Sequence, residues 1–232
     1  VDYEVWNPET DPHLWANYSA SDCGGKEENK RRLLDELGLD VDPSAPLVRM
    51  ISRLAEQKGF DLVMASFERM LSFGIGFVLL GTGSPQIEEF FRSATEKYPR
   101  QVAALITFSE QWAHRIEASS DIFLMPSRFE PCGLNQMYSL RYGTVPVVCA
   151  TGGLRDTVHE YNPHSKSGNG FTFRDYDAEE MLSSLRRAIG LYKEDPQAWM
   201  ELRDRGMAED HSWEASAKEY RDLYERALAT RA

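Results

Sequence analysis

Pro126-Ser127-Arg128-Phe129-Glu130-Pro131-Cys132-Gly133-Leu134 is the most informative segment of the chain for its fold. It follows the apolar run 122–125 and precedes a segment, 134–141, whose apolar residues have helical spacing. A buried strand therefore ends in a loop that opens a helix. Open α/β sheets bind ligands at such places, outside the carboxyl ends of their strands. The N–H groups at the helix start attract anions and Glu130 adds a carboxylate, which suits a ligand with a phosphate and hydroxyls, such as a sugar nucleotide.

Short apolar strands and helical segments alternate along the rest of the chain. The pattern predicts strands at 46–51, 76–80, 102–107, 122–125, 146–149 and 170–173, with helices near 26–39, 59–73, 87–94, 110–118 and 134–141. This alternation predicts an α/β fold, a Rossmann-like doubly wound parallel sheet with helices on both faces. Residues 1–25 are polar and irregular, and we expect them to lie outside the core. The last 55 residues are predicted to be helical, and the final helix carries an apolar stripe.

The composition indicates a globular protein and excludes several classes. The chain has 232 residues, 42% of them hydrophobic, and 26 basic against 37 acidic residues give a net charge of −11. This acidity disfavours nucleic-acid binding, because phosphate neutralisation needs clustered cations. No apolar run approaches the ~18–20 residues of a membrane span, and no signal peptide is visible. Cys23, Cys132 and Cys149 form neither a disulfide framework nor a metal motif, so we expect a reducing compartment.

Cations and glycines occupy the other loops at the carboxyl edge of the predicted sheet. Arg53 and Lys58 follow the first strand, where they are either a solvated pair or a guanidinium and an ammonium that stabilise a leaving diphosphate. Gly81 and Gly83 form a plain turn or allow a ligand to approach the backbone. Residues 152–153 offer a further nest of N–H donors. Because parallel strands end at one edge, these loops predict a single crevice.

Three further residues near these loops each have more than one interpretation. Glu130 could accept hydrogen bonds from sugar hydroxyls, act in acid–base chemistry or cap the following helix. Cys132 lacks the His, Asn or Asp spacing of a thiol nucleophile, so we expect it to serve packing. His114, on a helix, is expected to be a surface or packing residue rather than a ligand.

In this order, the motifs resemble those of bacterial glycogen synthases and plant starch synthases, along nearly the whole chain. The matching motifs are Ser52-Arg53-Leu54-x-x-Gln57-Lys58-Gly59, Gly81-x-Gly83, the opening stretch, Thr151-Gly152-Gly153-Leu154-x-Asp156-Thr157-Val158, and Val1-Asp2 with Trp6-Asn7-Pro8. The resemblance implies a retaining glucosyltransferase that moves glucose from ADP-glucose to the non-reducing end of an α-1,4-glucan. It implies ADP-glucose as donor substrate, with no cofactor and no metal.

The resemblance also implies roles for individual residues. The catalytic groups would be Glu130, Arg53 and Lys58. The donor diphosphate would be held by Arg53, Lys58 and the backbone amides of Gly133, Leu134 and Asn135. The sugar would meet Glu130 and Cys132. The nucleoside would meet Phe108, Tyr138, Gly81 and Gly83, with the Phe108 ring stacked on adenine and Tyr138 near the ribose.

Two residues depart from the pattern of related glycosyltransferases. Tyr138 stands eight positions after Glu130, where relatives often carry a second glutamate, and this affects the ribose contact. Asn135 stands where many relatives have threonine. This change would not alter a contact made by the backbone amide of residue 135. The family's Lys-x-Gly-Gly donor loop, which belongs to its first domain, is not among these residues.

The resemblance therefore implies the C-terminal half of a two-Rossmann-domain glycosyltransferase. We expect residues 1–25 to be a lead-in from the interdomain linker, 26–210 to be the nucleotide-sugar-binding domain, and 211–232 to be a helix that returns toward the N-terminal domain. Because the α-glucan acceptor would bind through that other domain, we expect this chain alone to bind ADP-glucose or ADP weakly and to transfer little glucose. The expected compartment is the bacterial cytoplasm, or the plastid in a plant or alga.

Two alternatives stay open at this point. The chain could be a non-catalytic nucleotide- or partner-binding module of the same fold, or part of a sucrose-type or trehalose-type synthase. The presence of Arg53, Lys58 and Glu130 favours an enzyme, and the Glu-Pro-Cys-Gly-Leu sequence favours a glucan synthase. The sequence does not decide between ADP-glucose and UDP-glucose or between glycogen and starch.

Overall fold

Within residues 1–229, which the computed structural model describes, six strands form a central sheet in the order β3-β2-β1-β4-β5-β6. Every neighbouring pair is parallel. The strands are β1 (Leu47–Ile51), β2 (Gly76–Leu80), β3 (Val102–Leu105), β4 (Ile122–Met125), β5 (Val145–Cys149) and β6 (Phe171–Phe173). The strand order reverses between β1 and β4, which makes this the switch point of a Rossmann-type sheet. The predicted doubly wound fold is confirmed.

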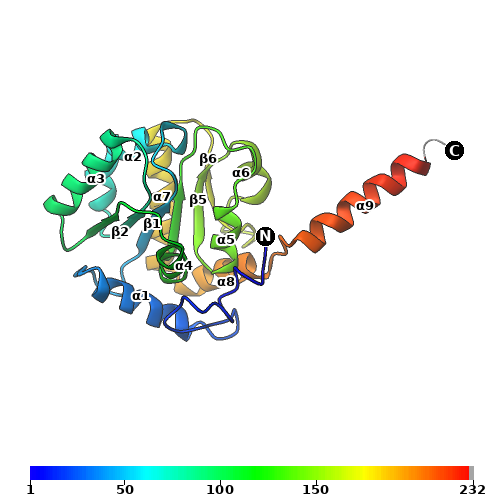
Figure 1. Ribbon diagram of the computed structural model, residues 1–232, viewed down its shortest axis with the longest axis horizontal. Coiled ribbons are helices and arrows are strands. Elements are labelled where there is room, and N and C mark those ends of the chain that lie inside the picture. The colour runs from blue at the N-terminus through cyan, green and yellow to red at the C-terminus, as the bar shows by residue number, and fades with distance from the viewer. Residues whose placement is uncertain (230–232) are drawn as a thin grey trace.

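Helices follow the strands in the predicted alternation (Figure 1). They are α1 (Gly24–Glu36), α2 (Phe60–Leu71), α3 (Pro85–Lys97), α4 (Glu110–Ser119), α5 (Asn135–Arg141), α6 (Gly152–Thr157), α7 (Ala178–Glu194), α8 (Pro196–Ala208) and α9 (Trp213–Ala229), with one 3-10 turn, η1 (Glu56–Lys58). Local chemistry sets several starts. Asp177 and Asp195 accept hydrogen bonds from first-turn amides of α7 and α8, and proline opens α3 and α8.

Successive side chains of a strand point to opposite sides, and apart from Arg49 in β1 most of those in this sheet are apolar on both faces. In β1, Val48 and Met50 join a core with residues of α2, α3 and α7, whereas Leu47 faces α1 and α4. In β4, Phe123 and Met125 pack with Leu154 of α6. The helices therefore cover both faces of the sheet, as expected for right-handed crossovers.

Residues 1–23 contain no helix or strand, yet they are packed against the domain. The ring of Trp6 lies between those of His114 and Tyr138, with centroids 3.9 and 4.0 Å away. Asp11 is buried, its Oδ2 lies 2.7 Å from His114 Nδ1, and it accepts a hydrogen bond from the Tyr142 hydroxyl (2.6 Å). The expectation that this segment lies outside the core is therefore wrong. His114 is a packing residue, buried by the same segment.

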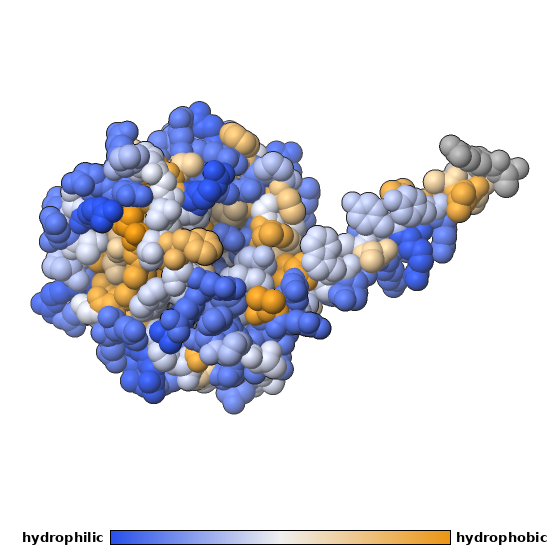
Figure 2. All heavy atoms as spheres, in the orientation of Figure 1, coloured by the Kyte–Doolittle hydropathy of each residue, from blue (hydrophilic) through white to orange (hydrophobic). Residues whose placement is uncertain are grey.

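The last described helix, α9, extends away from the domain (Figure 1) and buries none of its residues. One of its sides is hydrophilic and the other is pale to orange in Figure 2. Its exposed apolar and aromatic residues are Trp213, Tyr220, Leu223, Tyr224 and Leu228. The amino group of Val1 donates a hydrogen bond to the His211 carbonyl (2.6 Å), so the start of the chain lies at the base of α9. Residues 230–232 of the predicted C-terminal segment lie outside the described residues.

Candidate functional site

The loops that follow β1 and β4 lie side by side at the switch point. The Arg128 amide donates to the Gln57 carbonyl (2.9 Å), and the Gln57 side-chain amide donates to the Phe129 carbonyl (3.1 Å). Gly59 permits this approach, because its φ is +78° and a Cβ there would lie 2.0 Å from the Pro126 carbonyl oxygen. The loops after β1 and β4 are therefore in direct contact, and the single crevice expected for all four loops stays a prediction.

Lys58 and Glu130 meet across the two loops. Lys58 Nζ lies 2.5 Å from Glu130 Oε2, and the two side chains are only 16% and 11% exposed. The buried Ser127 donates a hydrogen bond to the same carboxylate oxygen (3.3 Å). Among the described residues, the Glu130 carboxylate is bonded by Lys58 and Ser127 and not by an amide of α5, which contradicts the capping interpretation. Ser127 was not among the predicted site residues, although it stands within the motif at 126–134.

Arg53 lies in the same loop as Lys58 but has an exposed side chain. Among the described residues, its guanidinium has no recorded hydrogen bond or ion pair, so it is available to an anion. Phe108, between β3 and α4, is 92% exposed and presents its ring to solvent. Both residues lie in loops at the carboxyl edge of the sheet, where the ligand of such a fold binds.

The backbone before α5 offers amides at this edge. Within residues 1–229, no acceptor is recorded for the N–H groups of Gly133, Leu134 and Asn135. The side chain of Asn135 has a partner of its own, because its Nδ2 donates to the carbonyl oxygen of Ile51 (2.8 Å) at the end of β1. Cys132 is exposed, so the prediction that it serves packing is wrong. Its thiol lies in the same loop as Glu130.

Gly81 and Gly83 accommodate protein backbone rather than open space. A Cβ at Gly81 would lie 1.9 Å from the Ser52 carbonyl oxygen, and one at Gly83 would lie 2.3 Å from that of Leu54. Their N–H groups donate to the Leu105 carbonyl (3.1 Å) and to the carboxylate of Glu88 (3.0 Å). These glycines hold the loops after β1 and β2 together, and their contact with a nucleoside stays a prediction.

The Gly152–Gly153 turn has a similar structural role beside Glu130. A Cβ at Gly152 would lie 2.1 Å from the Glu130 carbonyl oxygen, and one at Gly153 would lie 2.2 Å from that of Cys132. The Gly153 amide donates to the Glu130 carbonyl (3.0 Å), so this N–H group is not part of an open nest. The turn after β5 therefore supports the loop that carries Glu130.

The ring of Tyr138 lies on α5 and stacks against Trp6 at an interplanar angle of 5°. Partial burial raises the pKa of the Tyr138 hydroxyl above its ordinary value. The structure thus gives this ring a packing partner in the lead-in segment. Its position near a ribose stays a prediction.

A cavity of about 800 Å³ lies away from these loops. Its lining includes Ala45, Asp121 and Gly143, which precede β1, β4 and β5 at the opposite edge of the sheet. Lys30 in its wall is already held by Ala45, Asp121 and Tyr192. Among the described residues, no group of three or more His, Cys, Asp or Glu side chains is placed to hold a metal ion. No helix in the same part of the chain is long and apolar enough to cross a membrane.

The chain resembles known proteins along nearly its whole length. The family described as "Glycosyl transferases group 1" matches residues 38–202. The glycogen synthase of an Anaeromyxobacter species is 55% identical over 229 residues, which cover 99% of this chain and 48% of that protein. The glycogen synthase of Thermosipho melanesiensis is 48% identical over 231 residues, 100% of this chain and 48% of that protein.

One solved structure is closely similar. The catalytic domain of starch synthase IV from Arabidopsis thaliana, bound to ADP and acarbose, matches with a TM-score of 0.91 and 41% sequence identity. The match covers 99% of this chain and 48% of that chain. This chain thus spans about half the length of the relatives it matches.

Proposed function

The chain belongs to the group 1 glycosyl transferases, and from that membership we propose that it is the donor-binding half of a glycogen or starch synthase. Such an enzyme transfers glucose from ADP-glucose to the non-reducing end of an α-1,4-glucan and retains the anomeric configuration. The observation that carries the proposal is the contact of Lys58 with Glu130, 2.5 Å apart at the switch point of the sheet.

The chemistry of a diphosphate leaving group fits the charges at this edge. Negative charge grows on the diphosphate as the bond to the sugar breaks, and fixed cations stabilise that charge most strongly where water is excluded. Lys58 is mostly buried and Arg53 is exposed with no recorded partner among the described residues. The amides of Gly133, Leu134 and Asn135 add donors for the distal phosphate. With these groups present, we expect the transfer to need neither a metal nor another cofactor.

Glu130 and the diphosphate compete for Lys58 under this proposal. When the diphosphate takes the ammonium group, the carboxylate of Glu130 is released to accept hydrogen bonds from glucose hydroxyls. Ser127 keeps one oxygen of that carboxylate in place through its 3.3 Å hydrogen bond. The same loop can therefore orient the sugar for front-face transfer while the neighbouring loop holds the leaving group.

Adenine is the base we propose for the donor. The similar starch synthase IV structure has ADP bound, and the exposed Phe108 ring offers a flat apolar surface to an adenine ring. The α-glucan acceptor would bind mainly through the other half of the enzyme. We therefore expect this chain alone to bind the nucleotide and to transfer little glucose.

Calorimetric titration of the chain with ADP, ADP-glucose, UDP and UDP-glucose tests the proposal. We expect the adenine nucleotides to bind more tightly than the uridine nucleotides, and Arg53→Met to weaken binding of both adenine ligands. Absence of binding by all four at ~1 mM, a free energy weaker than about −4 kcal/mol, would rule the proposal out. Robust glucose incorporation by the chain alone would contradict the assignment of the acceptor to the other half.

A further inference from the structure

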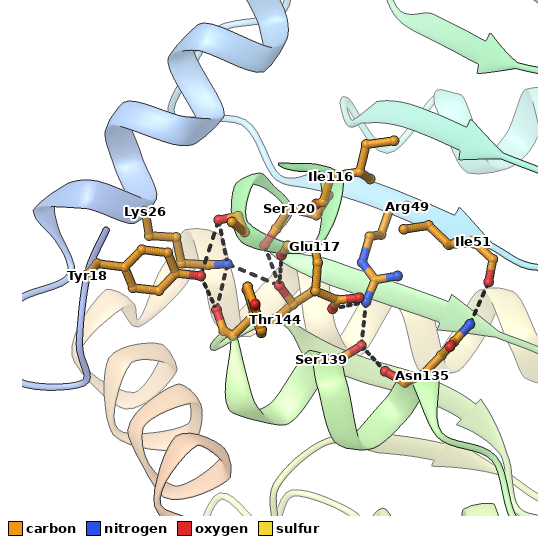
Figure 3. A network of polar contacts seen from close by, with 12 residues as sticks. Tyr18, Lys26, Arg49, Ile51, Ile116, Glu117, Ser120, Asn135, Ser139 and Thr144 are labelled. Carbon is orange, nitrogen blue, oxygen red and sulfur yellow. Dashed lines mark hydrogen bonds and ion pairs between the residues drawn. The ribbon is translucent and has the colours of Figure 1, made fainter. Parts of the chain in front are cut away.

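Arg49 is a charged residue in the middle of the central strand β1. Its side chain is 0% exposed, and its guanidinium lies 4.0 Å from the centroid of the Phe123 ring. It forms an ion pair with Glu117 of α4 and donates a hydrogen bond to the hydroxyl of Ser139 on α5 (Figure 3). Burying an ion pair costs desolvation free energy, and the attraction between the two charges often does no more than balance that cost. A contribution to the free energy of folding is therefore a poor explanation for this pair.

The same network continues from Ser139 to the end of β1. The Ser139 hydroxyl donates to the carbonyl of Asn135 (2.7 Å), and the Asn135 side chain donates to the carbonyl of Ile51 (2.8 Å). Figure 3 shows these contacts running along α5 beside β1. Strand β1 therefore contacts α5 at two points along its length, through Arg49 in its middle and through Ile51 at its carboxyl end.

These two elements carry the two halves of the proposed site. β1 leads directly into the loop with Arg53 and Lys58, and the loop with Glu130 leads directly into α5. A shift of α5 along β1 would change the separation between the cations and the carboxylate. Displacements of about 1 Å can cost a binding or catalytic site much of its effect, and hydrogen bonds to a charged guanidinium favour one geometry strongly.

We propose that Arg49, Ser139 and Asn135 are positioning residues that set the spacing between the Arg53–Lys58 loop and the Glu130 loop. The inference rests on the proposed function, since it assigns these residues to the same nucleotide site. Arg49 and Ser139 are completely buried, so they act through α5 and not by touching a ligand. The Asn135 side chain acts through its bond to Ile51.

Ser139→Ala tests the proposal with a matched control. This variant removes the bond from Arg49 to α5 and keeps the ion pair with Glu117. The control is Ser66→Ala on α2, because Ser66 is also buried and also donates to the carbonyl four residues earlier (Leu62, 2.7 Å), but does not contact Arg49. We expect Ser139→Ala to weaken ADP binding by roughly five- to tenfold, and Ser66→Ala to leave it within about twofold.

A second pair of variants isolates the contact at the end of β1. Thr and Val have the same shape, but only Thr keeps a side-chain donor, whose oxygen lies one bond closer to the backbone than Asn135 Nδ2. We expect Asn135→Val to weaken ADP binding by roughly fivefold and Asn135→Thr, which restores part of the donor function, to weaken it less. Arg49→Met is less suitable, because it would leave Glu117 buried without its partner and could unfold the chain.

Calorimetry gives the ADP dissociation constant of each variant, and thermal unfolding gives its stability. Weaker ADP binding by Ser139→Ala and Asn135→Val, at a stability equal to that of their controls, supports the positioning role. Unchanged ADP binding by both variants, while the unmodified chain binds ADP, overturns it and leaves the proposed function intact. If the unmodified chain binds no ADP, the proposed function fails and this inference fails with it.

Discussion

Lys58 and Glu130 show how a single ion pair links sequence motifs to chemistry. Each residue belongs to its own motif, and the two residues are 72 positions apart in the chain. A charge-assisted contact at 2.5 Å between mostly buried side chains uses one of the three donors of the ammonium group and offsets its charge. A diphosphate can form its strongest ion pair with Lys58 only after the Glu130 carboxylate has moved away from the ammonium group.

Replacement of Glu130 should therefore act on nucleotide binding in an unexpected direction. We expect Glu130→Gln to tighten ADP binding by roughly threefold, because the amide releases Lys58, while glucose transfer by the full-length enzyme falls by orders of magnitude. Lys58→Met should weaken ADP binding by at least about tenfold, through loss of a hydrogen bond to a charged group. The measurements are calorimetric titration with ADP and a glucose incorporation assay.

Lys97→Met is the control for the lysine substitution. Lys97 also pairs with a carboxylate, Glu68, but both side chains are more than half exposed and lie on α2 and α3. This variant should leave ADP binding unchanged. Weaker ADP binding by Glu130→Gln would show that the carboxylate does not compete with the diphosphate for Lys58.

At the scale of elements, the sequence predicted most boundaries closely. The first strand was predicted at 46–51 and spans Leu47–Ile51, and the third was predicted at 102–107 and spans Val102–Leu105. Buried parallel strands can be predicted from sequence because they form continuous apolar runs between turn residues.

The role of the glycine turns was harder to predict. Gly81 and Gly153 face neighbouring backbone, and their partners come from other loops.

Gly59 should be the least tolerant of the positions that join these elements. It has φ +78° and would place a Cβ 2.0 Å from the Pro126 carbonyl oxygen, whereas Gly38 has φ +66° and nothing within 4 Å. Gly38→Ala should cost about 1 kcal/mol through backbone strain alone. Gly59→Ala should lower the free energy of unfolding by about 3 kcal/mol or more, because the two loops must also separate.

Urea unfolding of both alanine variants measures this difference. Gly38→Ala controls for the left-handed backbone conformation, so the excess loss in Gly59→Ala reports the contact with the β4 loop. Equal losses in the two variants would mean that the loops move apart easily. ADP binding by Gly59→Ala, where the variant folds, should also be weaker, because the contact keeps Lys58 next to Glu130.

The whole molecule consists of a packed domain and a helix that stands away from it. Helix α9 buries none of its residues, whereas the preceding α8 buries Trp199 and Leu202 in the main core. The sequence predicted helices throughout this segment and set residues 211–232 apart as a helix that returns toward another domain. Apolar periodicity alone does not say which apolar stripe packs on this domain, because all such stripes have the same spacing.

Removal of α9 should leave the domain stable. We expect a chain that ends at Ser212, and so keeps the Val1–His211 contact, to unfold within about 2 °C of the unmodified chain, since little buried surface is lost. A chain that ends at Asp195 should lose several kcal/mol or fail to fold, because two large buried side chains are removed. Thermal unfolding by circular dichroism separates the two outcomes. A large drop in Tm on removal of α9 alone would contradict its independence.

The order and type of the elements, and the edge of the sheet at which the motifs lie, could be predicted from the amino-acid sequence alone. Those features depend on local apolar periodicity and on the common direction of parallel strands. Both can be recognised in a single amino-acid sequence. Only the tertiary structure decided that Lys58 meets Glu130, that Arg49 reaches Ser139 and that Gly81 and Gly153 face backbone. Such contacts depend on distances between segments far apart in the chain, and these distances are set by packing, which leaves no local pattern in the sequence.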